Sequence, residues 1–274
     1  MRYLRECIIV GGRTSGNNVL GKTRDRNYTP SIEIVRELLD DGLEILYLHD
    51  KITDYSEGMN SNGVGIVNSA LLVSDDENAV QLKAKSKNPS RDGKRIRHAL
   101  SRGSLKDVMQ ALVSYDGGVK GHTIVGDPKS LYSIEVTSKN KPIITKLDPM
   151  TGFDVRTNHG VEHPTAGYSP KRRPDDYLSS KMRHAQADIE IADIDDYEKL
   201  MPALAKQHFE PDSNLNMRRS TDNMRSTSQV MMNLDKKEFL CYLFPEECDY
   251  RGYVDKTPPA YNPKINLRVI QYKD

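Results

Sequence analysis

The stretch CIIVGGRTSGNNVLGKTRDRNY, residues 7–28, decides the fold that the rest of the chain follows. It holds two apolar runs, CIIVGG at 7–12 and VLGKTRD at 19–25, joined by a turn rich in Gly, Ser and Asn. This pattern is typical of a β-hairpin. Because hairpin strands run antiparallel, the charged segment KTRDRN at 22–27 returns beside Cys7 at the head of the first strand. Arginine and a carboxylate beside a thiol are surroundings that can activate it, so we expect Cys7 to carry chemistry.

Further along the chain, strands come first, helices lie in the middle, and strands close the sequence. Helices are expected within 93–114, with Ser104 as an N-cap, and at 175–191 and 197–207, while 165–174 has the composition of a loop. Other strands are expected at 44–50, 63–73, 121–127, 131–138, 141–148, 154–160, 228–234, 238–244 and 266–272. This order, with mostly hairpin-length connections, predicts an α+β layered fold with largely antiparallel sheets.

The composition excludes several classes of protein. The 274 residues are 36% hydrophobic and 29% charged, which excludes a disordered tail and a collagen-like repeat. With 40 Lys+Arg against 39 Asp+Glu, the chain has no global field to hold nucleic acid or an anionic membrane. We therefore expect neither a nucleic-acid nor a membrane partner, and interpret the basic runs 171–173 and 218–219 as solvated loops.

Location and cofactor use also follow from simple patterns. No apolar run approaches the roughly 20 residues of a membrane helix, and MRYLRE at 1–6 lacks the apolar stretch of a secretory signal. The three cysteines form neither a CxxC pair nor an obvious disulfide framework, which fits a reducing compartment. We expect a cytoplasmic protein with no metal and no cofactor. His159 and His163 have the spacing of two metal ligands on a helix, but Gly160 and Pro164 argue against a helix there.

Six short motifs follow one another in an order that resembles a known group of enzymes. The chain is similar to cysteine N-terminal-nucleophile (Ntn) hydrolases, in the branch of choloylglycine hydrolases and acyl-CoA:6-aminopenicillanic acid acyltransferase-like (peptidase C45) proteins. The similarity covers roughly residues 7–245 through these motifs. They are Cys7, GKTRDRNY (21–28), GMNSNGVGIVNSAL (58–71), TNHG (157–160), SSKMR (179–183) and STSQVMMNLDKKEFL (226–240).

The resemblance implies a four-layer αββα sandwich with two mostly antiparallel sheets. It implies a precursor that cuts itself between Glu6 and Cys7, so that residues 1–6 are a short propeptide and 7–274 form one domain. The freed α-amine of Cys7, with an ordinary pKa of about 7.7 to 8.0, then serves as the base for its own thiol. The implied enzyme is an amidohydrolase that cleaves a linear, non-peptide carbon–nitrogen bond of a small-molecule amide through a Cys7 thioester.

The resemblance also assigns roles to individual residues. Asp25 matches the aspartate that holds the nucleophile's α-amine. Arg24 is the nearest candidate for the arginine beside the thiolate, although Lys22 stands at the family position and can share that role. Asn158 matches an oxyanion-hole asparagine, and Asn68 is a candidate for a second such residue.

Two further candidates come from the later motifs. Arg183 matches the arginine of the SSxxR motif, which would stabilise the pocket or contact the leaving group. We take His159, like Lys22, as a candidate for substrate contacts.

Two other functions remain open on the sequence. One is acyl transfer on the same fold, in which an amine instead of water accepts the acyl group. The other is a non-catalytic descendant that serves in binding or assembly, since Lys22 replaces an arginine and Glu6 is an untypical residue before the nucleophile. A homo-oligomer is possible, and the sequence names no substrate.

Overall fold

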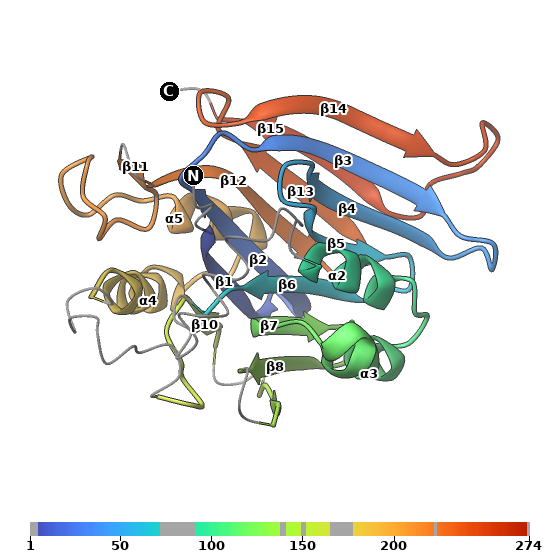
Figure 1. The fold of residues 1–274 in the computed structure, drawn as a ribbon, viewed down its shortest axis with the longest axis horizontal. Helices are drawn as coiled ribbons and strands as arrows, with labels where there is room; N and C mark the ends of the chain where they lie inside the picture. The colour runs from blue at the N-terminus through green and yellow to red at the C-terminus, as the bar shows by residue number, and fades with distance from the viewer. Residues whose placement is uncertain are drawn as a thin grey trace.

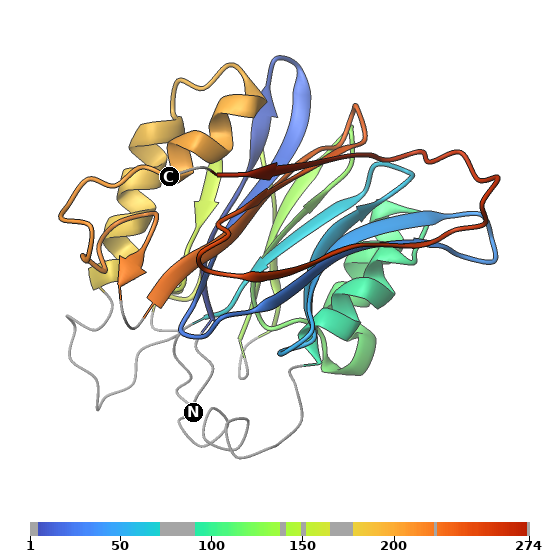
Figure 2. The same ribbon diagram turned by 90° about the horizontal axis from the view of Figure 1, so that it is seen from above.

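The computed structural model describes residues 5–71, 91–137, 141–148, 152–164, 178–221 and 224–272. Two β-sheets face each other between two helical layers (Figures 1 and 2). This α+β arrangement of helix, sheet, sheet and helix confirms the predicted fold class. The expected loop at 165–174 and the first residues expected for the helix at 175–191 lie outside the described residues.

The first sheet contains the expected hairpin near its centre. Within the described residues its order is β10-β1-β2-β12-β13-β15, with the short β11 beside β12, and only β13 and β15 pair in parallel. The strands of this sheet are β1 (Arg5–Thr14), β2 (Asn17–Arg26), β10 (Asp154–Arg156), β11 (Ser220–Thr221), β12 (Met224–Asn233), β13 (Glu238–Leu243) and β15 (Asn266–Gln271).

The second sheet has the order β14-β3-β4-β5-β6-β7-β8-β9 in the part of the chain that is described. Only β14 and β3 pair in parallel. Three of its strands, β3, β5 and β14, were not expected, because Glu, Arg, Asp and Gly residues interrupt their apolar pattern. The strands are β3 (Ser31–Leu38), β4 (Glu44–Asp50), β5 (Tyr55–Asn60), β6 (Gly65–Ser69), β7 (Gly121–Gly126), β8 (Leu131–Val136), β9 (Ile143–Lys146) and β14 (Asp249–Lys256).

The helices cover the two outer sheet faces. On the second sheet lie α2 (Asp92–Leu100) and α3 (Leu105–Ser114), followed by the 3-10 turn η1 (Tyr115–Gly117). On the first sheet lie α4 (Leu178–Ile191), η3 (Tyr197–Lys199) and α5 (Leu200–Leu204). The predicted N-cap of α3 is confirmed, because the Ser104 Oγ accepts a hydrogen bond of 3.2 Å from the Asp107 backbone N–H.

Three apolar clusters lie between the four layers, and strand alternation explains which residue enters which cluster. On β1, Ile9 points into the core between the sheets, while Ile8 and Val10 pack against α4 and α5. Successive strand residues point to opposite faces, so a strand buried on both sides needs the continuous apolar run seen at 7–10.

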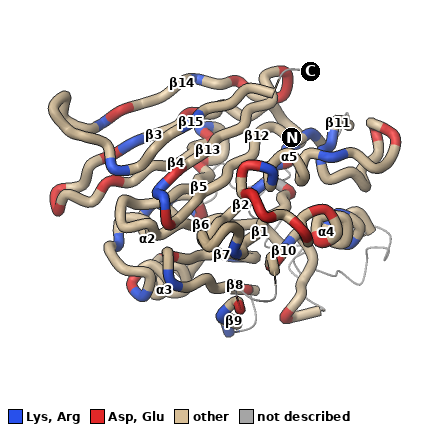
Figure 3. Tube along the Cα trace, turned by 180° about the vertical axis from the view of Figure 1, so that it is seen from behind, with Lys and Arg blue, Asp and Glu red and all other residues tan. Residues whose placement is uncertain are grey.

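Charged residues of both signs are spread over the helices, loops and sheet edges of the described chain (Figure 3). This distribution agrees with the near-zero net charge of the sequence. Among the described helices, none has the length and apolar character needed to cross a membrane.

Helix α2 can approach the second sheet closely because its second residue is Gly93. A Cβ at this position would overlap the backbone carbonyl oxygen of Asp54, which cannot move away as a flexible side chain could. We expect Gly93→Ala to lower the free energy of unfolding by about 3 kcal/mol, the range of severe overpacking. Gly103→Ala is the matched control, because a Cβ there meets only ordinary contacts. Urea unfolding of both variants tests this, and equal losses would contradict it.

Candidate active site

The head of β1 presents neighbouring residues to two different environments. The β1–β2 register pairs Cys7 with Arg24 and Glu6 with Asp25. Because directly paired residues share a sheet face, Cys7 and Arg24 lie on the side of the inter-sheet core, whereas Glu6 and Asp25 lie on the side of α4. The site therefore has two faces: a thiol face with Cys7 and Arg24, and a carboxylate face with Glu6 and Asp25. The consecutive residues Glu6 and Cys7 point to opposite faces.

On the thiol face, the guanidinium of Arg26 lies against the nucleophile candidate. Its Nη1 is 3.7 Å from the Cys7 Sγ and donates a hydrogen bond of 3.3 Å to the Glu6 carbonyl oxygen. Burial opposes the charge of Arg26, but the acidic groups of Tyr28, Cys7 and Asp50 around it raise the pKa of Arg26 above its ordinary value. Arg26 is thus a permanent cation that touches both the sulfur and the preceding carbonyl.

Beneath this arginine, Lys22 and Arg24 belong to a buried ion-pair network. The Lys22 Nζ is 3.1 Å from one carboxylate oxygen of Glu57, and the Arg24 Nε is 3.3 Å from the other. Arg24 also reaches Asp50 at 3.9 Å. Burial lowers the pKa of Lys22 to about 8. The structure therefore directs the guanidinium of Arg24 to carboxylates, whereas Arg26, which the sequence analysis did not select, lies beside the thiol.

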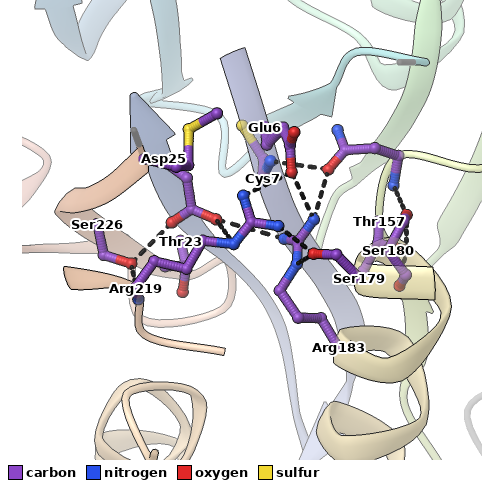
Figure 4. Close-up of polar contacts among 12 residues, drawn as sticks. Glu6, Cys7, Thr23, Asp25, Thr157, Ser179, Ser180, Arg183, Arg219 and Ser226 are labelled. Carbon is purple, nitrogen blue, oxygen red and sulfur yellow. Dashed lines mark hydrogen bonds and ion pairs between the residues drawn. The ribbon is translucent and has the colours of Figure 1, made fainter. Parts of the chain in front are cut away.

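On the carboxylate face, Asp25 accepts hydrogen bonds from Ser226 and Arg183 and forms a longer ion pair with Arg219 (Figure 4). Its Oδ1 accepts from the Ser226 Oγ at 2.7 Å, and its Oδ2 lies 3.3 Å from Arg183 Nη1 and 3.8 Å from Arg219 Nε. Burial raises the pKa of Asp25, and the two arginines oppose that shift. Asp25 thus links β2 to α4, to β12 and to the segment before β11, whereas the Cys7 backbone N–H donates to Asn158.

Glu6 completes this cluster. Its Oε2 is 3.0 Å from Arg183 Nη2 and 2.6 Å from Arg219 Nη1 (Figure 4). Burial and the neighbouring Arg219 lower the pKa of Arg183 to about 10. The interpretation of Arg219 as a solvated loop residue was wrong: its side chain is 2% exposed, because two carboxylates from the start of the chain and the hydroxyl of Ser179 surround it.

Asn158 connects Cys7 to α4 and β6. Its Oδ1 accepts hydrogen bonds from the Cys7 backbone N–H at 3.2 Å and from Arg183 Nη2 at 3.1 Å. Its Nδ2 donates to the Ser69 Oγ at 3.0 Å and to the Ala70 carbonyl at 2.7 Å. Asn158 therefore holds the backbone nitrogen of Cys7, and its own amide N–H groups donate to protein oxygens.

The structure does not bring the side chain of Asn68 to Cys7. Its Nδ2 donates to the His122 carbonyl at 2.7 Å and to the Thr123 Oγ1 at 2.9 Å, both on β7. Its Oδ1 accepts from the hydroxyl of Tyr55 on β5. Asn68 thus links three strands of the second sheet.

His159 lies in the turn that carries Asn158. Its Nδ1 is 3.1 Å from the Thr157 Oγ1 and 3.0 Å from the Ser180 Oγ, and Ser180 also accepts from the Asn158 backbone N–H at 2.8 Å. Burial, with the neighbouring charge of His184, lowers the pKa of His159 to about 4. A neutral His159 therefore ties this turn to the first turn of α4.

The other two cysteines differ from Cys7 in their surroundings. Cys241 in β13 and Cys248 before β14 are free and buried. Burial raises the pKa of both thiols, that of Cys248 to about 11. Within the described residues, no group of three or more His, Cys, Asp or Glu side chains could hold a metal ion.

A cysteine that heads a central strand and faces the space between the two sheets of an αββα sandwich defines the class: this is the fold of an Ntn hydrolase. A family model described as acyl-coenzyme A:6-aminopenicillanic acid acyl-transferase matches residues 13–233. The chain belongs to this family.

Two solved structures are similar to this chain at low sequence identity. An N-acylethanolamine-hydrolyzing acid amidase (NAAA) ortholog from Caenorhabditis elegans superposes with a TM-score of 0.59 at 12% identity, covering 83% of this chain and 92% of that one. Penicillin V acylase from Agrobacterium tumefaciens gives a TM-score of 0.47 at 9% identity, covering 92% and 98%. The first similarity shows a common fold. A comparison with curated proteins finds no match.

The low pKa of His159 predicts a pH dependence of stability. The folded chain keeps this imidazole neutral down to pH about 4, whereas in the unfolded chain it takes up a proton near its ordinary value of 6.5. The unfolded state then binds more protons between these values, so the free energy of unfolding falls as the pH falls from 6.5 towards 4. We expect His159→Asn to lose less stability than wild type over this range. The measurement is the urea midpoint of unfolding of both proteins at several pH values. Equal changes of the midpoint with pH in the two proteins would contradict the prediction.

Proposed function

We propose that this protein is a cysteine amidohydrolase that first removes residues 1–6 from its own chain and then cleaves a linear carbon–nitrogen amide bond other than a peptide bond. One observation carries the proposal: the guanidinium of Arg26 contacts both the Cys7 sulfur and the Glu6 carbonyl oxygen. These are the attacking atom and the oxygen that gains negative charge when the preceding peptide bond is attacked. The family of the chain and its likeness in fold to an amidase support the same chemistry.

The self-cleavage step uses groups already in contact. The Cys7 thiolate, stabilised by Arg26, attacks the Glu6 carbonyl carbon, and the negative charge moves onto the oxygen to which Arg26 donates. The carbon–nitrogen bond then breaks, and the Cys7 nitrogen takes up the proton that the thiol gave up. Glu6 is now a thioester on the sulfur, and water hydrolyses it to the free acid and the thiol. Asn158 Oδ1 already accepts from the Cys7 nitrogen and would retain the new α-amine.

Substrate turnover repeats these steps with the α-amine as base. The amine takes the proton of the thiol, and the thiolate attacks the amide carbonyl of the substrate. The proton passes to the departing nitrogen, which leaves as an amine, and water cleaves the thioester. The substrate carbonyl would occupy the former position of the Glu6 carbonyl, within reach of Arg26.

Acyl transfer is the second candidate, and the description of the matching family favours it. The two reactions share the thioester and differ only in whether water or an amine accepts the acyl group. Product analysis of one amide with and without an added amine separates them. A new amide that forms in proportion to the amine identifies a transferase, whereas free acid alone identifies a hydrolase.

Self-cleavage predicts a mass change that depends on the thiol. Purified wild type should lose the mass of MRYLRE on incubation at neutral pH, and Cys7→Ala should keep it because no nucleophile remains. Intact-mass spectrometry of the two proteins is the measurement. A wild type that retains residues 1–6 would contradict self-cleavage and favour the non-catalytic alternative.

The contacts of Arg26 predict which arginine the cleavage requires. Arg26→Lys keeps the charge but shortens the side chain, so the hydrogen bond to the Glu6 carbonyl should be lost. We expect cleavage to slow by about a hundredfold, the usual effect of removing one hydrogen-bond donor from an oxyanion hole. Arg36→Lys is the matched control, since Arg36 is a buried arginine that pairs with Glu44 elsewhere. The time course of intact mass gives both rates. A larger loss in Arg24→Lys than in Arg26→Lys would assign the role to Arg24 instead.

A further inference from the structure

The uncleaved chain already holds an acyl group in the site, and that acyl group is the residue Glu6. In self-cleavage the Glu6 carbonyl becomes the thioester carbonyl on Cys7, which is also the place of the acyl carbonyl in substrate turnover. Whatever contacts the Glu6 side chain is therefore in position to contact the acyl chain of a substrate. The contacts on its carboxylate are Arg183 Nη2 at 3.0 Å and Arg219 Nη1 at 2.6 Å.

This pair of arginines is built into the fold. The side chain of Arg183 is fully buried and that of Arg219 is 2% exposed, whereas that of Glu6 is 13% exposed. Ser179 accepts hydrogen bonds from both arginines and so fixes their relative position. A ligand can therefore reach the guanidinium groups from the side on which Glu6 lies.

Charge balance changes when Glu6 departs. Before cleavage, the two arginines face two carboxylates, those of Glu6 and Asp25. After cleavage Asp25 alone remains, and a buried guanidinium without a counter-charge is unfavourable. The vacated position then favours an anion, and a carboxylate fits it because it can accept from both arginines as Glu6 does.

We propose that Arg183 and Arg219 form a carboxylate-binding acyl subsite, and that the substrates are monoamides of dicarboxylic acids with the carboxylate spaced from the amide carbonyl as in a glutaryl group. This spacing is that of the Glu6 side chain relative to its own carbonyl. The substrate class rests on the proposed function, whereas binding of a carboxylate by the arginine pair does not require catalysis.

The first experiment measures acyl preference in the cleaved enzyme. Wild type is given the 4-nitroanilide of glutaric acid and, separately, the 4-nitroanilide of its neutral half-amide, which has the same shape. We expect kcat/KM to favour the acid by tenfold or more, and Arg219→Gln to abolish that ratio. Arg218→Gln is the matched control and keeps the ratio, since Arg218 stacks on Phe244 outside the cluster. Equal kcat/KM for the two compounds in wild type would overturn the substrate class while leaving the amidase function in place.

The second experiment needs no turnover. In the Cys7→Ala background, which keeps residues 1–6, the further change Glu6→Ala removes the carboxylate from the arginine pair. Acetate should then raise the melting temperature of Cys7→Ala/Glu6→Ala more than that of Cys7→Ala, and acetamide should not. Equal shifts in the two proteins would overturn the subsite. If wild type hydrolyses no amide, the proposed function and the substrate class fail, and this measurement alone decides whether the pair binds carboxylates.

Discussion

Hydrogen bonding between β1 and β2 fixes, at one register, which side chains face the core between the sheets and which face the helices. The pairing of Cys7 with Arg24 and of Glu6 with Asp25 separates the thiol from the carboxylate cluster. A slip of one residue would exchange the two faces, moving the thiol towards α4 and Glu6 to the side between the sheets, away from Arg183 and Arg219. The apolar run that follows on β1 is buried on both faces and opposes such a slip through packing.

The same register forces charges into the interior on both faces. On the thiol face Lys22, Arg24 and Arg26 alternate along β2, with Glu57 and Asp50 as their described carboxylate partners. Buried charges are costly, and apolar residues of similar size could fill the same space without that cost. Three cations therefore face two carboxylates in the interior beside the sulfur of Cys7.

The sequence was sufficient for the α+β class and for the position of the thiol, because both follow from local patterns, whereas the order of the four layers came from the resemblance to Ntn hydrolases. The hairpin at 7–28, the N-cap Ser104 and the strand at 44–50 are signalled by adjacent residues. The sequence could not show which of Arg24 and Arg26 lies beside the thiol, because both side chains point to the same face of β2. The guanidinium of Arg24 pairs with carboxylates of β4 and β5, which are distant in the sequence. Arg219 was missed for a related reason, since its partner Glu6 lies more than two hundred positions away in the sequence.

These long separations also determine when the site exists. Cys7 meets Asn158 across 151 residues, Asp25 meets Arg183 across 158, and Asp25 meets Ser226 across 201. Contacts between such distant segments close large loops, so they form only when most of the fold is in place. Glu6 supplies a counter-charge for Arg183 and Arg219 as soon as these distant segments meet. Glu6 therefore joins the two faces of the site: its carboxylate pairs with both arginines, and its backbone carbonyl accepts from Arg26 beside the thiol.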